Sequence, residues 1–135
     1  MQIKQKKISG MKILLLVGLG GAVGSMLRYL TTLFVMNRMT GLSFPLGTFI
    51  VNVTGCLLIG IVFGLSERYQ WMTPQFRIFL MTGICGGYTT FSAFAFENIR
   101  LFQESAYITS FMYIAASLLF CLLAVFLGMM CVKYF

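Results

Sequence analysis

Polar side chains inside long apolar stretches are the residues of this sequence that could do chemistry. The first is Arg28, near the middle of an apolar stretch that contains no acidic residue to neutralise it. A charged side chain at the centre of a membrane costs about 2.5 to 3.5 kcal/mol on insertion scales, so it needs a partner or a water-filled cavity. The alternative is that the stretch leaves the membrane near Arg28, whose side chain then extends to the headgroups.

A second polar position is Asn52, with Thr48 four residues before it and Gly55 three residues after it. On a helix these three residues share one face, which is polar and small while the rest of the helix is apolar. Amide and hydroxyl groups offer hydrogen-bond donors that can replace the water around an anion. Alternatively, they form a hydrogen bond between helices that only packs them, worth about 0.6 kcal/mol on average in membranes.

The third apolar stretch contains two adjacent glycines, Gly86 and Gly87, followed by the hydroxyl residues Thr89, Thr90 and Ser92. This composition predicts a break of the helix in mid-membrane. The backbone carbonyls that such a break frees can coordinate a cation such as Na⁺. A straight helix that packs through its glycines is the alternative.

Two further patterns lie beyond the predicted break. Phe91 and Phe94 share a helix face, and the positive edges of their rings could attract an anion, although this spacing is more typical of a packed core. In the last stretch, Thr109, Tyr113 and Ser117 recur every four residues and form a hydroxyl stripe. Such a stripe could hydrate an ion, or its hydroxyls could bond to their own backbone.

Positioning these residues requires a membrane-spanning scaffold. Of the 135 residues, 59% are hydrophobic, and the mean hydropathy is +0.92, far above that of a water-soluble domain. A span needs roughly 20 apolar residues to cross about 30 Å of hydrocarbon. Four stretches meet that length: 13–36, 44–66, 78–96 and 106–132.

The sequence therefore predicts an all-α membrane protein with four transmembrane helices, the third broken at mid-membrane. A basic N-terminal tail over 1–12 precedes one transmembrane domain over 13–135. Glycine pairs at G-x-x-x-G spacing, such as Gly20 and Gly24, favour close helix contact and a dimeric bundle. The same pairs could instead pack helices within one subunit.

The composition also excludes several classes of function. The chain has no His, no Asp and three Glu, which leaves little for acid–base catalysis or for a metal site made of side chains, so we expect no enzyme and no catalytic residues. The four Cys lie in apolar stretches and lack C-x-x-C spacing, which indicates that they pack as small apolar residues. The net charge of +7 comes from scattered Lys and Arg, which indicates membrane topology and no nucleic-acid partner.

Three strings of residues together resemble the CrcB/Fluc fluoride channel family. They are Gly20-Gly21-Ala22-Val23-Gly24 with Arg28-Tyr29, Gly47-Thr48-Phe49-Ile50-Val51-Asn52 with Gly55, and Gly83-Ile84-Cys85-Gly86-Gly87-Tyr88-Thr89-Thr90-Phe91-Ser92-Ala93-Phe94. The resemblance implies a multi-pass channel in the lipid of the bacterial inner membrane that lets toxic fluoride leave passively. It also implies an antiparallel, dual-topology homodimer with two pores and a structural Na⁺ at the centre of the dimer interface.

The resemblance also assigns roles to residues. The fluoride pathway would contain Asn52, Phe91, Phe94, Ser92, Tyr113, Ser117, Thr48 and Arg28, with Arg28 anchoring the vestibule. Gly86 and Thr89 would supply backbone carbonyls to Na⁺. Ala93 departs from the pattern, because the family commonly has a hydroxyl residue between the two phenylalanines.

The distribution of basic residues bears on the homodimer. Seven Lys and Arg fall on one side of the four spans and two on the other, which predicts both termini inside. A dual-topology chain should have a bias near zero, so a heterodimer with an oppositely biased paralogue stays open beside the favoured homodimer.

Two other functions remain as alternatives. A proton-coupled exporter of the small multidrug type is also built from four spans and dimerises, but it needs a carboxylate embedded in the membrane. The acids here lie at the ends of the predicted spans, with Glu97 the deepest. The third alternative is a non-conducting subunit of a membrane assembly.

Overall fold

A computed structural model describes residues 10–39, 41 and 43–134, so most of the predicted basic tail lies outside the described residues. The described chain is helical, and its elements are α1 (Gly10–Arg38), α2 (Leu46–Arg68), α3 (Pro74–Ile78), the π-helical stretch η1 (Phe79–Cys85), α4 (Gly86–Tyr88), α5 (Phe91–Gln103) and α6 (Tyr107–Tyr134). Helix α1 begins at Gly10, so the last residues of the predicted tail are helical.

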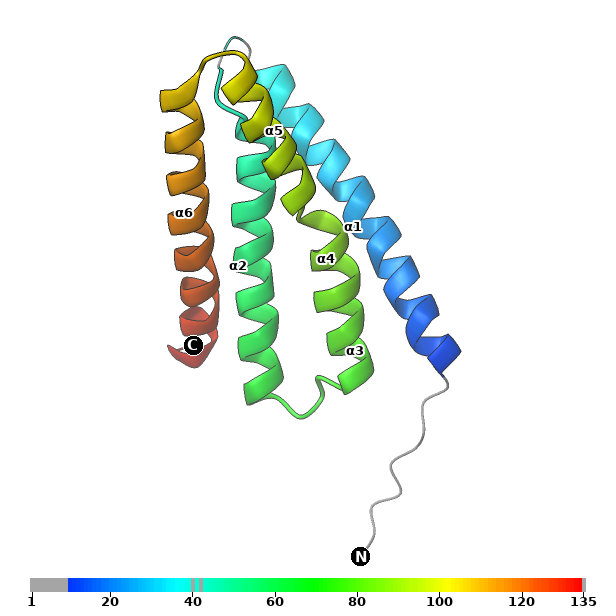
Figure 1. Cartoon of the computed structure of the whole chain (residues 1–135). Helices are drawn as coiled ribbons and strands as arrows, with labels where there is room; N and C mark the ends of the chain where they lie inside the picture. The colour runs from blue at the N-terminus through cyan, green and yellow to red at the C-terminus, as the bar shows by residue number, and fades with distance from the viewer. Residues whose placement is uncertain (1–9, 40, 42, 135) are drawn as a thin grey trace, which may run out of the picture.

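Four helical segments are long and apolar enough to cross a membrane: α1, α2, the third segment Pro74–Gln103, and α6. The third segment combines α3, η1, α4 and α5 (Figure 1). The predicted all-α fold with four crossings and a broken third helix is therefore confirmed, and the chain is a multi-pass membrane protein. The third crossing extends past the predicted end at residue 96 to Gln103, which places Glu97 inside it.

The break lies at Thr89 and Thr90, where the backbone is extended, with ψ angles of 157° and 117°. The first half of the crossing ends where Thr89 N and Thr89 Oγ1 both donate to Cys85 O, at 2.9 and 3.0 Å. The second half begins where Thr90 Oγ1 caps α5 by accepting from Ala93 N at 3.2 Å. Hydroxyl residues thus satisfy backbone groups at both ends of the interruption.

Glycines hold the first half of the third crossing against α1. A Cβ added to Gly20 would lie 2.8 Å from Phe79 O, and one added to Gly24 would lie 2.8 Å from Tyr88 N. Any side chain at these positions would push the two backbones apart. The G-x-x-x-G pair of α1 therefore packs helices within one subunit, which was the alternative to a role in dimerisation.

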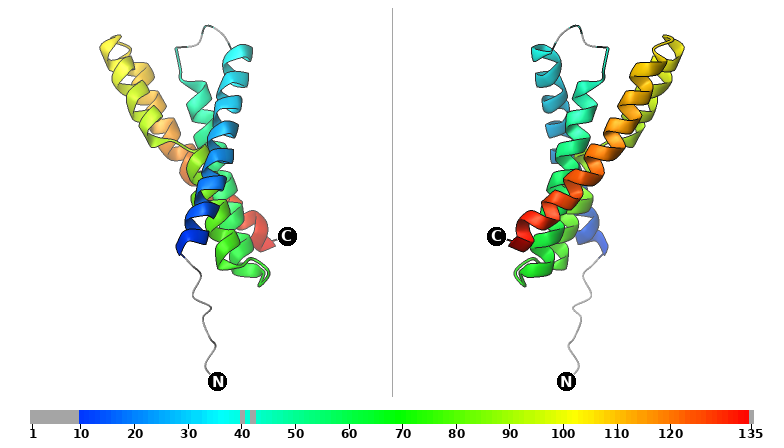
Figure 2. Two further views of the ribbon diagram at one scale, coloured as in Figure 1. Left: turned by 90° about the vertical axis from the view of Figure 1, so that its right-hand side faces the viewer. Right: turned by 90° about the vertical axis from the view of Figure 1, so that its left-hand side faces the viewer.

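The four crossings do not form a closed bundle. Figure 2 shows α5 and the start of α6 diverging from the end of α1 and the start of α2, so that the molecule resembles a V in side view. Asn52, Phe91 and Phe94 line one cavity, and Arg28 and Thr48 line another, and residues of α5 border both.

Candidate functional site

Asn52 closes the backbone gap at the break of the third crossing. Its amide nitrogen donates to Thr90 O at 3.1 Å, and its Oδ1 accepts from Thr90 N at 2.8 Å. The amide of Asn52, on α2, therefore bonds to both backbone groups of Thr90, as a peptide group of a neighbouring chain segment would. The second N–H of the amide is left over, so Asn52 can serve the break and still offer one donor to an ion.

The break changes the partners of two backbone carbonyls, those of Gly86 and Thr89. In a continuous helix the N–H groups of Thr90 and Ala93 would donate to them. Here Thr90 N donates to Asn52 Oδ1, and Ala93 N donates to Thr90 Oγ1. These two carbonyls are the ones that the resemblance assigns to Na⁺, and carbonyl oxygens are ligands that suit hard cations.

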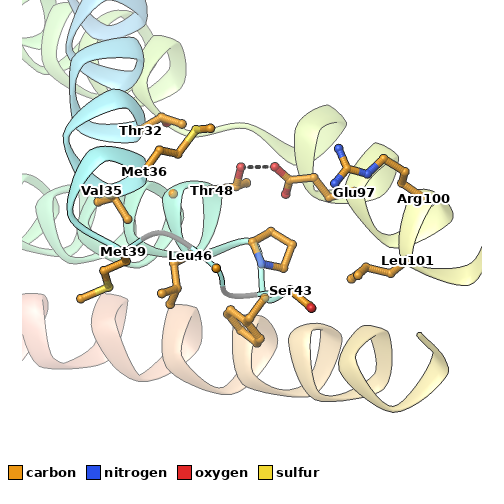
Figure 3. Close-up of a pocket in the computed structure, with 14 residues that line it drawn as sticks. Thr32, Val35, Met36, Met39, Ser43, Leu46, Thr48, Glu97, Arg100 and Leu101 are labelled. Atoms are coloured by element: carbon orange, nitrogen blue, oxygen red, sulfur yellow. Dashed lines mark hydrogen bonds between the residues drawn. The ribbon is translucent and has the colours of Figure 1, made fainter. Parts of the chain in front are cut away.

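A carboxylate joins three helices one turn from Asn52. Glu97 of α5 accepts from Thr48 Oγ1 of α2 at 2.6 Å (Figure 3) and from the Tyr113 hydroxyl of α6 at 2.8 Å. Thr48 and Tyr113 are buried, with 6% and 0% of their surface exposed. Reasoning from sequence missed Glu97 because its charge was taken to end the apolar stretch, although it follows Phe94 by three residues and so shares its helix face.

The predicted aromatic pair has one ring against the protein and one facing outward. The ring centroids of Phe91 and Phe94 are 5.6 Å apart, and that of Phe94 is 5.1 Å from the ring of Tyr113. Phe91 is 79% exposed in the single chain. Its apolar ring therefore needs either lipid or a second chain to cover it.

A cavity of about 350 Å³ brings half of the predicted pathway residues together, and Arg28, Thr48, Ser92 and Tyr113 do not line it. Its lining includes Asn52, Thr89, Phe91, Phe94 and Ser117, together with three of the cysteines. Among the described residues, Ser117 Oγ is the one buried side-chain oxygen or nitrogen without a hydrogen-bond partner. A buried hydroxyl without a partner costs free energy, and here it points to a ligand for its proton.

Arg28 lies at a second cavity of about 350 Å³, which is lined by residues of α1, α2 and α5 and by Thr90. This cavity is also lined by Thr48, Thr90, Ala93 and Glu97. Arg28 is half-buried and lies ten residues before the end of α1. Ala93, the departure from the family pattern, thus leaves one wall of the Arg28 cavity without a hydroxyl.

The remaining predicted residues lie at the edge of this arrangement. Ser92 pairs with Thr90 through their hydroxyls, at 3.1 Å, on an exposed part of α5.

Ser110, which the sequence did not single out, donates to Asn98 Oδ1 at 2.8 Å and joins the start of α6 to α5. Asn98 is buried, and its amide also donates to Phe94 O at 2.8 Å.

In the described chain no group of three or more His, Cys, Asp or Glu could hold a metal ion. The site as a whole offers hydroxyl and amide donors, two freed carbonyls, aromatic ring edges and one arginine. Such a set can replace the water around a small anion, and its freed carbonyls can bind a small cation.

Comparison with known proteins shows that the chain matches one protein family over most of its length. A family model described as "CrcB-like protein, Camphor Resistance (CrcB)" matches residues 15–129. The chain is similar to "Fluoride-specific ion channel FluC" of Flavobacterium psychrophilum, with 47% identity over 123 residues that cover 91% of this chain and 98% of that protein.

Two further relatives carry the same name. The protein of Azobacteroides pseudotrichonymphae is 42% identical over 125 residues, which cover 93% of this chain and 99% of that protein. The protein of Rhizobium meliloti is 46% identical over 119 residues, which cover 88% and 94% of the two chains. The similarity thus spans all four crossings.

Proposed function

This chain belongs to the CrcB family, and we propose that it is a fluoride-selective ion channel that lets fluoride leave the cell passively and so reduces its toxicity in the cytoplasm. The observation that carries the proposal is the cavity lined by Phe91, Phe94, Asn52 and Ser117, the last with a buried hydroxyl that has no hydrogen-bond partner. These groups can bind a small anion without a fixed positive charge that would trap it.

The arrangement supports a path in three parts. Arg28 attracts anions into its cavity, whose lining includes Thr90, and Asn52, which is hydrogen-bonded to Thr90, lines the next cavity. Phe91 and Phe94 follow, with ring edges that favour a negative charge. Ser117 and Tyr113 follow, one turn apart on α6. The hydroxyl of Ser117 has no partner, and that of Tyr113 donates to Glu97 and can replace water around fluoride only when it leaves that carboxylate.

The path described above has walls on one side only in the single chain, so we propose an antiparallel homodimer of dual topology. The exposed ring of Phe91 supports this, because a second copy would cover it and would bring a second aromatic pair to the pore. A heterodimer with a paralogue would serve the same purpose if the basic residues fix one orientation. We also propose that the membrane is the bacterial inner membrane.

The carbonyls of Gly86 and Thr89 support a structural Na⁺ site at the centre of the proposed dimer. Two copies of the break would bring four such oxygens together, and their lone pairs would coordinate Na⁺ in place of water. The chain's own residues keep these carbonyls available, because Asn52 and Thr90 divert the N–H groups that would otherwise bond to them.

Fluoride efflux from liposomes tests the proposed function. Liposomes that contain the chain alone, with fluoride inside and valinomycin to balance charge, should lose fluoride rapidly and chloride slowly, as read with ion-selective electrodes. A proton-coupled exporter would need a pH gradient, and a non-conducting subunit would release neither ion. Absence of flux from folded protein would overturn the homodimeric channel.

A further inference from the structure

A third cavity, of about 400 Å³, opens between the end of α1, the start of α2 and α5, and it reaches Thr48 and Glu97. The cavity of Arg28 also reaches these two residues. The hydrogen bond from Thr48 Oγ1 to Glu97 Oε1, 2.6 Å long, therefore lies between the two cavities. Figure 3 shows this bond at the edge of the larger cavity.

Arg100 is the basic residue that lines this larger cavity. It lies one helical turn after Glu97 on α5, and its Nε pairs with Glu104 Oε1 at 3.2 Å. Figure 3 shows its guanidinium on the side of Glu97 that faces away from Thr48. Arg100 thus has one carboxylate three residues before it and another four residues after it, both within reach on a helix.

The pair between Arg100 and Glu104 is held weakly. The two side chains are 63% and 56% exposed, and exposed ion pairs of this kind contribute little to stability. Arg100 can therefore leave Glu104 at little cost, and the cavity provides room for its side chain toward Glu97.

Glu97 itself restricts the pathway. Thr48 and Tyr113 each have a single hydroxyl proton, and both protons point to Glu97. Neither hydroxyl can donate to an anion while these bonds are made. If an anion accepts hydrogen bonds from the two hydroxyls, the carboxylate of Glu97 loses its partners and has a second negative charge beside it. This arrangement is unfavourable unless a cation approaches the carboxylate.

We propose that Arg100 is that cation: a positioning residue that exchanges Glu104 for Glu97 and so releases the hydroxyls of Thr48 and Tyr113 to fluoride. The inference rests on the proposed function, because it concerns the donors of the same pathway. Arg100 does not touch the ion. Glu104 competes for Arg100 and keeps it away from Glu97.

The two partners of one ion pair should therefore have opposite effects on transport. Arg100→Gln should lower the rate of fluoride efflux about two- to five-fold, and Glu104→Gln should raise it by a similar factor, which is the range that an exposed ion pair can account for. High ionic strength should reduce both effects through screening. Arg38→Gln is the matched control, since Arg38 ends α1, lies over the ring of Phe34 at 5.2 Å and does not line the cavity.

A Glu97→Gln background separates this role from a merely structural one. If Arg100 acts through Glu97, adding Arg100→Gln or Glu104→Gln in that background should no longer change the rate. A purely structural ion pair would predict changes of the same sign for both substitutions, in either background.

The outcomes distinguish the two proposals. Rapid efflux by the wild-type chain, with equal rates or changes of the same sign in the two variants, would overturn the role of Arg100 and leave the channel intact. Absence of wild-type efflux would overturn the proposed function and this inference with it.

Discussion

The third crossing is held by different contacts on the two sides of its break. Before the break, backbone lies against backbone: Gly20 and Gly24 of α1 bring that helix against η1 and α4. After the break, α5 is held by side-chain hydrogen bonds: the hydroxyls of Thr48 and Tyr113 donate to Glu97, and that of Ser110 donates to Asn98. Close backbone packing excludes ions, whereas polar side chains between splayed helices can exchange partners. This difference supports the proposed pathway beside α5 and a supporting role for the first half.

Asn52→Leu should have the largest effect, because it removes the group that joins the two halves. Two hydrogen bonds to Thr90 are lost, and the N–H and C=O of Thr90 are left without partners, at a cost of about 2 to 4 kcal/mol. We expect a marked fall in melting temperature and loss of fluoride efflux. Ser66→Ala is the control, because that hydroxyl donates to Phe63 O of its own helix; an unchanged melting temperature in Asn52→Leu would contradict the account.

Gly24→Ala tests the tightly packed half. The added Cβ would lie 2.8 Å from Tyr88 N, and such overpacking costs about 1 to 3 kcal/mol. Thermal unfolding in detergent should show a lower melting temperature. Gly18→Ala on the same helix has no atom within 4 Å of its new Cβ and should be neutral or slightly stabilising. Equal behaviour of the two variants would show that α1 does not pack as described.

Tyr113→Phe tests the hydrogen-bonded half without removing a ring. The contacts of the ring with Phe44 and Phe94, at 5.2 and 5.1 Å, remain, while the bond to Glu97 is lost. A loss of about 1 to 1.5 kcal/mol of ion stabilisation corresponds to roughly a five- to ten-fold lower efflux rate. The melting temperature should also fall by a few degrees, because a buried bond to the Glu97 carboxylate is lost. A full rate would remove Tyr113 from the pathway.

Ser110→Ala should have the smallest effect. It removes one buried hydrogen bond to Asn98, worth about 1 kcal/mol, from the contact between α5 and α6. The melting temperature should fall by a few degrees, and efflux should stay within about two-fold of the wild type. A larger loss of efflux than in Tyr113→Phe would mean that the alignment of α5 with α6 matters more than the donors themselves.

The division of the third crossing into two halves follows largely from local sequence. The glycine pair Gly86 and Gly87, followed by Thr89 and Thr90, predicts the break, because glycine weakens a helix and hydroxyls can cap the new ends. The four crossings follow from hydropathy. The partner that repairs the break could not be predicted, since Asn52 and Thr90 are 38 residues apart and only the packing of α2 brings them together.

The interpretation of Glu97 failed for a related reason. A charge at the end of an apolar stretch usually marks the membrane boundary, but here α5 continues to Gln103 and the carboxylate turns inward to two hydroxyls. The partners of Glu97 come from α2 and α6, so local sequence does not reveal them. The finding also removes the sequence-based argument against an embedded carboxylate, and the family relationship now decides between channel and exporter.

The most direct test of a pathway beside α5 compares two exposed phenylalanines of that helix. Phe91, 79% exposed, lines the cavity of Ser117, whereas Phe96, 67% exposed, does not. The measurement is the initial rate of fluoride efflux from liposomes that contain wild type, Phe91→Ile or Phe96→Ile, each with its oligomeric state verified. The account predicts a rate at least about ten-fold lower for Phe91→Ile, equal to about 1.4 kcal/mol on the barrier, and a normal rate for Phe96→Ile. A normal rate for Phe91→Ile, or equal losses in both variants, would contradict it.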